Sequence, residues 1–186
     1  MSHTIKTNSV YYLTLTVVEW ADVFTRKENR DIIIDSFRHC IKHKGLNVYA
    51  YCIMSNHIHM VVNCKEPFQL KDTIRDFKKH TAKENLKLIN TNKESRRIWL
   101  LDLFESNAMK SKKHKRYKFW KGGNHAIELI KPNFTWQKIE YIHQNPVKAG
   151  LVSKATDWIY SSALNYADEE AILEEVICVS AKQITF

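Results

Sequence analysis

The stretch that decides the fold is Ala50–Asn63, which reads A-Y-C-I-M-S-N-H-I-H-M-V-V-N. Two short apolar runs overlap it, Val48–Met54 and Ile58–Val62, with the turn-forming residues Ser55 and Asn56 between them. Apolar runs of this length on either side of a turn predict two adjacent strands.

The second of these strands carries His57 and His59. Because strand residues two apart point to the same face, both imidazoles should project side by side, with Ile58 on the other face. Two neutral imidazoles in this arrangement make half of a divalent-metal site. The alternative is two polar positions on a half-exposed strand, because a His-x-His pair alone does not define a metal site.

The flanking segments predict the rest of the fold. Their patterns favour a strand at Val10–Val18, helices at Lys27–Lys44 (ended by Gly45), Gln69–Ile89 and Phe134–Asn145 (ended by Pro146), and a closing segment at Trp158–Tyr166 that packs on the core. A fourth strand is expected near Tyr117–Trp120, and Ile98–Phe104 has no clear periodicity. The order β-α-β-β-α-β predicts an α+β class with a ferredoxin-like (split βαβ) antiparallel sheet and its helices packed on one face.

Length and composition predict one globular domain over residues 1–186, with a core at about 10–166 and an extension at 167–186 that could add a helix and a strand. The net charge of +9 favours a polyanionic partner, nucleic acid before an anionic membrane. The four cysteines include no Cys-x-x-Cys pair, so we expect reduced thiols in a cytoplasmic, nucleoid-associated protein. No stretch resembles a signal peptide or a membrane span.

The most basic window is Met109–Lys121, where lysines alternate with aromatic residues. Positive charge suits a phosphate backbone and flat rings suit unstacked bases, so the window favours single-stranded nucleic acid. The alternative is a solvated lysine loop. The helix at Gln69–Ile89 also has a basic face, although acidic residues dilute it. The candidate contacts are Lys112, Lys113, Lys115, Arg116, Lys118 and Trp120 in the window, and Arg75 and Lys79 on the helix.

Three motifs together carry a family resemblance. They are S-N-H-I-H at Ser55–His59, W-K-G-G-N-H-A at Trp120–Ala126, and Y-I-H-Q-N-P-V-K-A-G-L-V at Tyr141–Val152. The sequence resembles the single-tyrosine HUH transposases, IS200-like transposases, and most closely their REP-associated tyrosine transposase branch. The resemblance spans about residues 10–166.

This resemblance implies an HUH-endonuclease palm and metal-dependent cleavage and rejoining of single-stranded, hairpin-bearing DNA through a 5′-phosphotyrosine. By motif position, His57, His59 and Asn145 match the ligands of Mg²⁺ or Mn²⁺, and Tyr141 matches the nucleophile. Competing tyrosines are Tyr117, Tyr160 and Tyr166. His125, His143 and Lys138 could support the ligands or the nucleophile, and His143 could equally be structural.

The resemblance to the REP-associated branch favours a monomer over a homodimer. One alternative function is a related HUH nickase or replication initiator. Another is a non-catalytic binding module for single-stranded DNA or RNA on an RRM-like sheet, which predicts exposed aromatic side chains on the sheet. A domesticated, inactive copy is a third.

Overall fold

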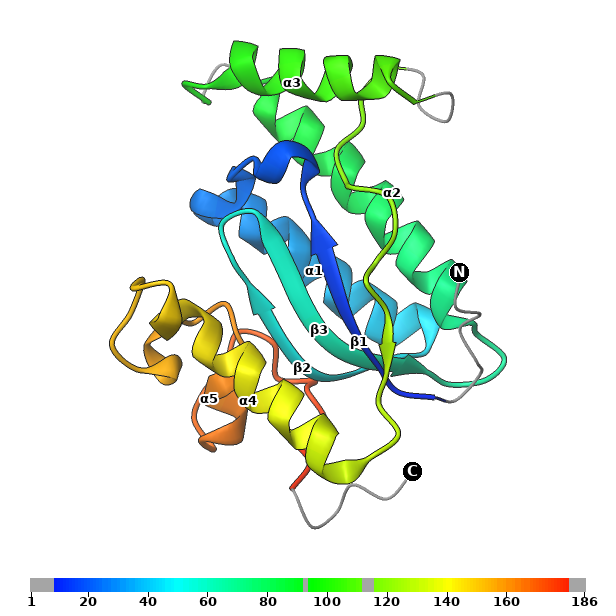
Figure 1. Ribbon diagram of the computed structural model, residues 1–186, viewed down its shortest axis with the longest axis vertical. Helices are drawn as coiled ribbons and strands as arrows, with labels where there is room; N and C mark the ends of the chain where they lie inside the picture. Colours follow the sequence, from blue (N-terminus) through cyan, green and yellow to red (C-terminus); the bar gives the residue numbers. More distant parts are fainter. Residues whose placement is uncertain (1–8, 92–93, 112–115, 181–186) are drawn as a thin grey trace.

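The computed structural model describes residues 9–91, 94–111 and 116–180, which contain both helices and strands. Its strands are β1 (Tyr11–Thr16), β2 (Leu46–Ile53), β3 (His57–Cys64) and β4 (Ile127–Glu128). They form one antiparallel sheet in the order β2-β3-β1-β4 (Figure 1). The predicted fold class is confirmed, with β1 and β3 as the central strands.

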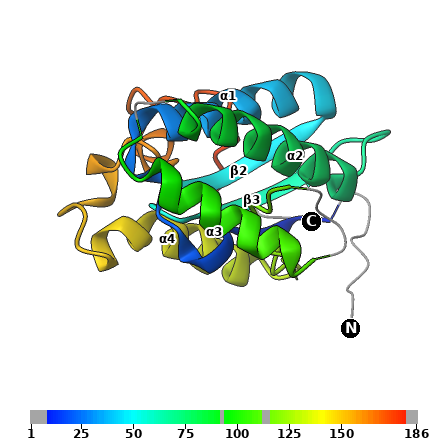
Figure 2. The same cartoon turned by 90° about the horizontal axis from the view of Figure 1, so that it is seen from above.

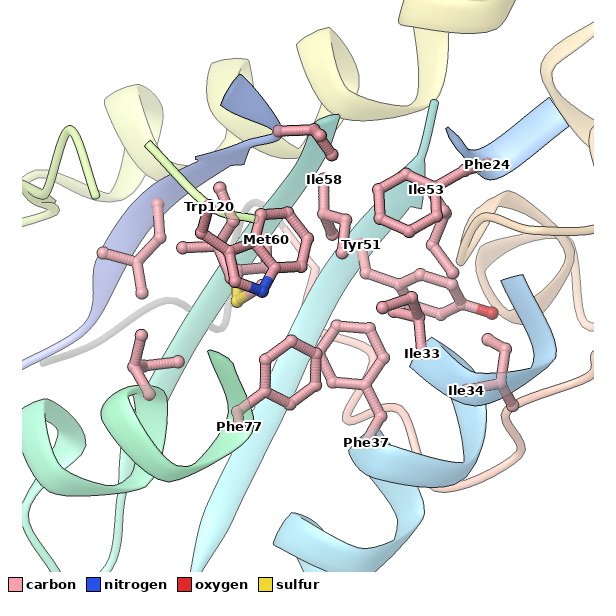
Figure 3. Packing of buried hydrophobic residues seen from close by; sticks show 14 of the residues in the cluster. Phe24, Ile33, Ile34, Phe37, Tyr51, Ile53, Ile58, Met60, Phe77 and Trp120 are labelled. Carbon is pink, nitrogen blue, oxygen red and sulfur yellow. The ribbon is translucent and has the colours of Figure 1, made fainter. Parts of the chain in front are cut away.

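Helices α1 (Lys27–Lys44) and α2 (Leu70–Ile89) cover one face of the sheet, as predicted (Figure 2). Strand residues that alternate toward this face are buried against them, among them Ile58 of β3. Figure 3 shows Phe37 of α1 beside Phe77 of α2, and their ring centroids are 5.0 Å apart. Helix α1 ends at Gly45, which adopts the predicted left-handed conformation with φ of 61°.

Helix α4 (Pro132–Lys148) lies against the opposite face of the sheet (Figure 2). Its Ile139 and Ile142 form a second, smaller core with strand residues that include Ala50 and Val61. The expectation of helices on one face therefore holds for α1 and α2, whereas α4 packs on the other side. This placement brings α4 to the face from which His57 and His59 project.

Helix α4 also extends further than predicted, because it continues through Pro146 to Lys148. A proline removes one backbone donor from a helix. Here the loss falls in the last turn, where the N–H of Ala149 still donates to Asn145 O at 2.9 Å. The Pro146 ring is buried, so packing helps to offset the lost hydrogen bond.

The apolar run without clear periodicity belongs to helix α3 (Arg97–Met109), which lies across the end of α2 (Figure 1). Leu100 and Phe104 are buried, while Ile98 and Trp99 are exposed. Apolar residues on both faces of this helix hide the period that would have identified it.

Two further predictions, a strand near Tyr117–Trp120 and a helix and strand in the extension, do not hold in the described residues. The fourth strand is Ile127–Glu128, and around Tyr117–Trp120 only Trp120 forms an isolated bridge, to Val17. Residues 167–180, the described part of the extension, contain neither a helix nor a strand. The remaining short helices are η1 (Val18–Trp20), η2 (Val23–Thr25), η3 (Ala155–Asp157) and α5 (Ala163–Tyr166).

The closing segment packs on the core as predicted, by running along the free edge of β2. The N–H of Ile53 donates to Tyr160 O, and the N–H of Ser162 donates to Tyr51 O, each at 2.9 Å. These bonds cover an edge that would otherwise expose unpaired backbone groups. None of the helices in the described residues combines the length and apolar content that crossing a bilayer requires.

Candidate active site

His57 and His59 converge at the start of β3. Their Nε2 atoms are 3.1 Å apart, and the ring planes meet at 75°. Two ligand nitrogens about 2.1 Å from one ion and at a right angle to each other would be about 3 Å apart. The observed separation therefore fits a pair of imidazoles that share one cation.

The other ring nitrogens are held by hydrogen bonds. His57 Nδ1–H donates to Asn56 Oδ1 at 2.6 Å, so the Nε2 of the neutral ring carries a lone pair. His59 Nδ1 lies 2.7 Å from the Tyr12 hydroxyl and 3.0 Å from Thr14 Oγ1. Hydroxyls can donate or accept, so His59 can hold its proton on either nitrogen and can free Nε2 for a cation. Such hydrogen bonds are typical of metal-binding histidines.

Burial keeps both imidazoles neutral. Desolvation lowers the pKa of His57 to about 4. It lowers the pKa of His59 to about 3, and the nearby His57 and Lys138 add to this shift. Neutral imidazole is the form that binds metals, so the pair is ready to coordinate at neutral pH.

Tyr141 reaches the histidine pair from α4. Its ring is 39% exposed and lies edge-on to His59, with the ring centroids 5.6 Å apart. The Lys138 Nζ is 5.6 Å from the centroid of the Tyr141 ring, and the Lys148 Nζ is 5.4 Å from it. Both ammonium groups therefore make cation–π contacts with the phenol ring.

The third predicted ligand, Asn145, lies one helical turn after Tyr141. Its Nδ2 donates to Tyr141 O at 2.7 Å, which leaves the amide oxygen as the atom that could coordinate a cation. Among the described residues, no three His, Cys, Asp or Glu side chains are grouped to hold a metal ion. If the pair holds a cation, a third donor from the described residues would have to be of another type, such as this amide.

The competing tyrosines lie elsewhere. Tyr160 is buried with the α1 core and its hydroxyl donates to Asp31 at 2.8 Å. The Tyr166 hydroxyl donates to Tyr49 O at 2.8 Å. Tyr117 stacks under the Arg116 guanidinium, 5.0 Å from its ring centroid. Of these candidates, only Tyr141 has a recorded ring contact with the histidine pair in the described part of the chain.

The three residues predicted to support the ligands or the nucleophile differ in where they lie. Lys138 belongs to the site, since its Nζ is also 4.9 Å from the centroid of the Tyr12 ring. His143 is buried, and its Nε2 shares a hydrogen bond of 2.8 Å with Ser162 Oγ. Its ring also contacts Tyr166, so these contacts favour a structural role for His143. His125 is exposed in a left-handed conformation with φ of 42°.

The prediction that Trp120 contacts DNA needs correction. It is buried in the core beside Phe24 (Figure 3), and its Nε1 donates to Lys78 O at 3.1 Å and to Thr81 Oγ1 at 3.2 Å. Its ring could stack on a base only if the core opened. The basic residues around it misled the sequence interpretation, because only tertiary packing decides which ring is buried.

Two of the remaining candidates, those on α2, lie on the opposite side of the sheet from the histidine pair. Lys112, Lys113 and Lys115 lie outside the described residues, Arg116 is exposed and Lys118 is half-buried. Arg75 and Lys79 are exposed on α2, which covers the other face of the sheet. Arg75 is also paired with Asp72 at 2.6 Å.

Sequence reasoning missed three residues that contact the pair. Tyr12 and Thr14 could have been found from strand alternation, because β1 pairs with β3 and Thr14 is opposite His59. Trp20 lies edge-on to His57, with the ring centroids 5.8 Å apart. Nothing in the local sequence signals this placement.

Comparison with known proteins identifies the family of the chain. Residues 6–117 match the family described as Transposase IS200 like, a range that includes the histidine pair and ends before α4. A solved REP-associated tyrosine transposase bound to a REP hairpin has a similar fold, with a TM-score of 0.60 at 15% identity over 92% of this chain and 88% of that one. A putative transposase from Deinococcus radiodurans R1 has a TM-score of 0.44 at 13% identity, over 77% and 94% of the respective chains. No curated protein matches the sequence. The chain therefore belongs to the IS200-like transposase family.

Proposed function

We propose that this transposase cleaves and rejoins single-stranded DNA with Tyr141 as the nucleophile. The observation that carries the proposal is the convergence of His57 and His59 from β3 with Tyr141 from α4, in which the rings of His59 and Tyr141 are 5.6 Å apart. Two neutral imidazoles beside a phenol suit a metal-assisted attack on a phosphodiester, and an oxygen of Asn145 completes the proposed ligand set.

In the proposed step, the Tyr141 hydroxyl gives its proton to water and its oxygen attacks the phosphorus. The bond from phosphorus to the 3′ oxygen breaks, and that oxygen takes up a proton from water. The products are a 5′-phosphotyrosine and a free 3′-OH, so attack by a second 3′-OH reverses the step and rejoins a strand. When bound, Mg²⁺ or Mn²⁺ would neutralise and polarise the phosphate.

Lys138 and Lys148 support this role by their charge. Their ammonium groups lie 5.6 and 5.4 Å from the centroid of the Tyr141 ring. At these positions both cations would attract the phosphate that the tyrosine attacks. The cation–π contact of Lys138 with Tyr12 keeps that amine on the sheet side of Tyr141.

We propose hairpin-bearing single-stranded DNA as the substrate. The structural relative was solved with a REP hairpin, and the net charge of +9 suits a nucleic acid. The non-catalytic alternative predicts exposed aromatic side chains in the middle of the sheet. Tyr12, the aromatic residue beside His59, is 6% exposed, which does not favour that alternative.

The direct test is a covalent-adduct assay. Wild-type protein and Tyr141→Phe are incubated with a pool of labelled single-stranded hairpin oligonucleotides, with Mn²⁺, with Mg²⁺ or with chelator. We expect a denaturation-resistant protein–DNA band only with metal and only with the tyrosine. A band in Tyr141→Phe would move the nucleophile to another residue, and no band with any hairpin despite tight binding would favour the binding module.

The ligand set is tested without any reaction. Mn²⁺ binding, followed by electron paramagnetic resonance of the free ion, should be lost in His57→Ala and in His59→Ala. Asn145→Ala should weaken it at least about tenfold if the amide oxygen coordinates. Gln144→Ala is the matched control, since this exposed neighbour is a comparable amide on the same helix. Equal Mn²⁺ affinity in Asn145→Ala and Gln144→Ala would remove Asn145 from the set.

We further propose that one chain supplies the whole site. The supporting contact is the packing of α4 on its own sheet through Ile139 and Ile142. Mixing Tyr141→Phe with His57→Ala tests this, because neither variant alone has both the nucleophile and the histidine pair. We expect the mixture to form no adduct. An adduct in the mixture would require Tyr141 of one chain to act at the histidines of another, as in a dimer.

A further inference from the structure

Trp20 is an exposed aromatic side chain beside the histidine pair. Its side chain is 55% exposed, and its ring lies edge-on to His57 with the ring centroids 5.8 Å apart. The Lys121 Nζ lies 4.4 Å from the centroid of the Trp20 ring. A flat apolar ring, a cation and the histidine pair therefore meet at one place on the surface.

The backbone that presents Trp20 is strained. Glu19 and Trp20 have φ of 52° and 56°, two consecutive left-handed residues, neither of them glycine. This conformation is unfavourable for a residue with a bulky side chain and persists only where the surroundings enforce it. The flanking Val18 and Ala21 are buried, so the turn holds Trp20 at the surface while its neighbours enter the core.

The same segment is tied to the turn that carries His57. The N–H of Val17 donates to Asn56 O at 3.0 Å, and the N–H of Phe24 donates to Ser55 O at 2.8 Å. The side chain of Asn56 in turn accepts from His57 Nδ1. These bonds hold the backbone on both sides of Trp20 against the turn that precedes His57.

We infer that Trp20 is a stacking platform for a nucleobase of the single-stranded DNA, next to the phosphate that is cleaved. The inference rests on the proposed function, because the histidine pair locates that phosphate. A base adjacent to this phosphate can reach a ring that contacts His57, and stacking of an unpaired base on an aromatic ring is favourable whatever the base. Lys121 supplies positive charge beside the ring for the phosphate of the same nucleotide.

The charge and exposure of the position favour this ligand over a protein partner. The Trp20 ring lies beside a cation, Lys121, and beside the histidine pair. A protein interface would need a wider apolar patch than one ring. A base offers a flat face to the ring and a phosphate to Lys121 at the same time. Trp120, the ring first considered for this role, is buried and its indole N–H is satisfied inside the core.

The test compares two probes that differ only in their bases. Fluorescein-labelled dT12 and a 12-mer of abasic nucleotides, which keeps the backbone charge, are titrated by anisotropy with chelator present. The proteins are wild type, Trp20→Phe, Trp20→Ala and Trp99→Ala. Trp99 is the matched control, because it is also an exposed tryptophan, 51% exposed on α3. Within the described part of the chain, the aromatic rings in contact with the histidine pair are those of Tyr12, Trp20 and Tyr141.

Trp20→Ala should bind dT12 about tenfold more weakly than wild type and the abasic probe equally well. Trp20→Phe should retain most of the affinity, since it keeps a ring, and Trp99→Ala should match wild type. Equal affinity of wild type and Trp20→Ala for dT12 would overturn the inference, as would equal losses in Trp20→Ala and Trp99→Ala. A loss on both probes would also overturn it, because the ring would then act on the backbone or on the fold.

A second measurement separates this inference from the proposed function. In the adduct assay, Trp20→Ala with a reactive hairpin should need about tenfold more DNA for half-maximal adduct, with the same final yield. If no protein forms an adduct but dT12 binding still depends on Trp20, the cleavage proposal fails and the platform stands as a binding site. If adducts form and Trp20→Ala changes neither assay, the cleavage proposal stands and the platform is wrong.

Discussion

Replacing Tyr12 by phenylalanine should weaken metal binding by the histidine pair without disturbing the fold. The change removes the hydroxyl that lies 2.7 Å from His59 Nδ1 and keeps the ring that stacks on His59 at 5.5 Å between centroids. Burial raises the pKa of Tyr12 to about 12, so wild type keeps a neutral hydroxyl there at neutral pH. The variant therefore removes a hydrogen-bonding group and no charge.

The expected loss can be estimated from the partners that remain. Replacing the hydrogen-bond partner of a metal-binding histidine typically costs 10- to 100-fold in affinity, about 1.4 to 2.7 kcal/mol. Thr14 Oγ1 stays 3.0 Å from the same nitrogen, so the loss in Tyr12→Phe should be near the lower limit, about tenfold. The double variant Tyr12→Phe/Thr14→Val leaves His59 Nδ1 without either hydroxyl and should lose about 100-fold.

The assay is a Mn²⁺ titration followed by electron paramagnetic resonance, with the free energy of unfolding measured in urea for each variant. Tyr49→Phe is the control, because it removes a half-buried tyrosine hydroxyl that lies 3.4 Å from Asn63 Oδ1 and contacts neither histidine. Its Mn²⁺ affinity should equal that of wild type. If the double variant also binds Mn²⁺ like wild type, then Tyr12 and Thr14 do not prepare His59 as a ligand, and the reasoning from hydrogen bonds to metal affinity is refuted.

Three further predictions concern stability and are measured by urea denaturation. Gly45→Ala should destabilise by at least about 1 kcal/mol, because φ is 61° and a Cβ would lie 2.6 Å from Phe68 Cδ2; equal stability would show that the α1 end adjusts freely. Lys78→Met should cost about 2 kcal/mol, since the ammonium donates to three oxygens, including Asn124 Oδ1 at 3.0 Å; no loss would mean that water replaces it. Burial lowers the pKa of His143 to about 4, against about 6.5 when unfolded, so the unfolded chain takes up the proton first. The free energy of unfolding should then fall by up to about 3 kcal/mol per such histidine between pH 6.5 and 4, and His143→Gln should flatten part of that fall; an unchanged slope would contradict the assignment.

Much of the fold could be predicted from the sequence because its local signals agree with its packing. The bounds of α1 follow from an apolar stripe and a terminal glycine, and β2 and β3 follow from apolar runs around a turn. The side of the sheet on which α4 packs could not be predicted. Its amphipathic pattern shows that one face is buried, but not which surface buries it.

Part of the candidate site could also be predicted from local sequence, and part could not. Strand alternation predicts that His57 and His59 share a face, and the Nε2 separation of 3.1 Å confirms that prediction. The contact of His59 with Tyr141 depends on how α4, a helix much later in the chain, crosses the sheet, so only the family resemblance suggested it. Trp20 carries no local signal, because left-handed backbone at a tryptophan is set by its neighbours and not by its own preference.

Three features that break local rules occur close together on one face of the sheet. Two buried imidazoles face each other, a bulky residue adopts a left-handed backbone, and a tyrosine on a packed helix stays 39% exposed. The desolvated imidazoles and the left-handed backbone each cost stability. The face where α1 and α2 pack is lined mainly by apolar residues. Strain and desolvation that coincide at one place are typical of selection for a function there. The cluster joins His57, Trp20 and Tyr141 from three separate elements, so the histidine pair, the proposed base platform and the proposed nucleophile form one site.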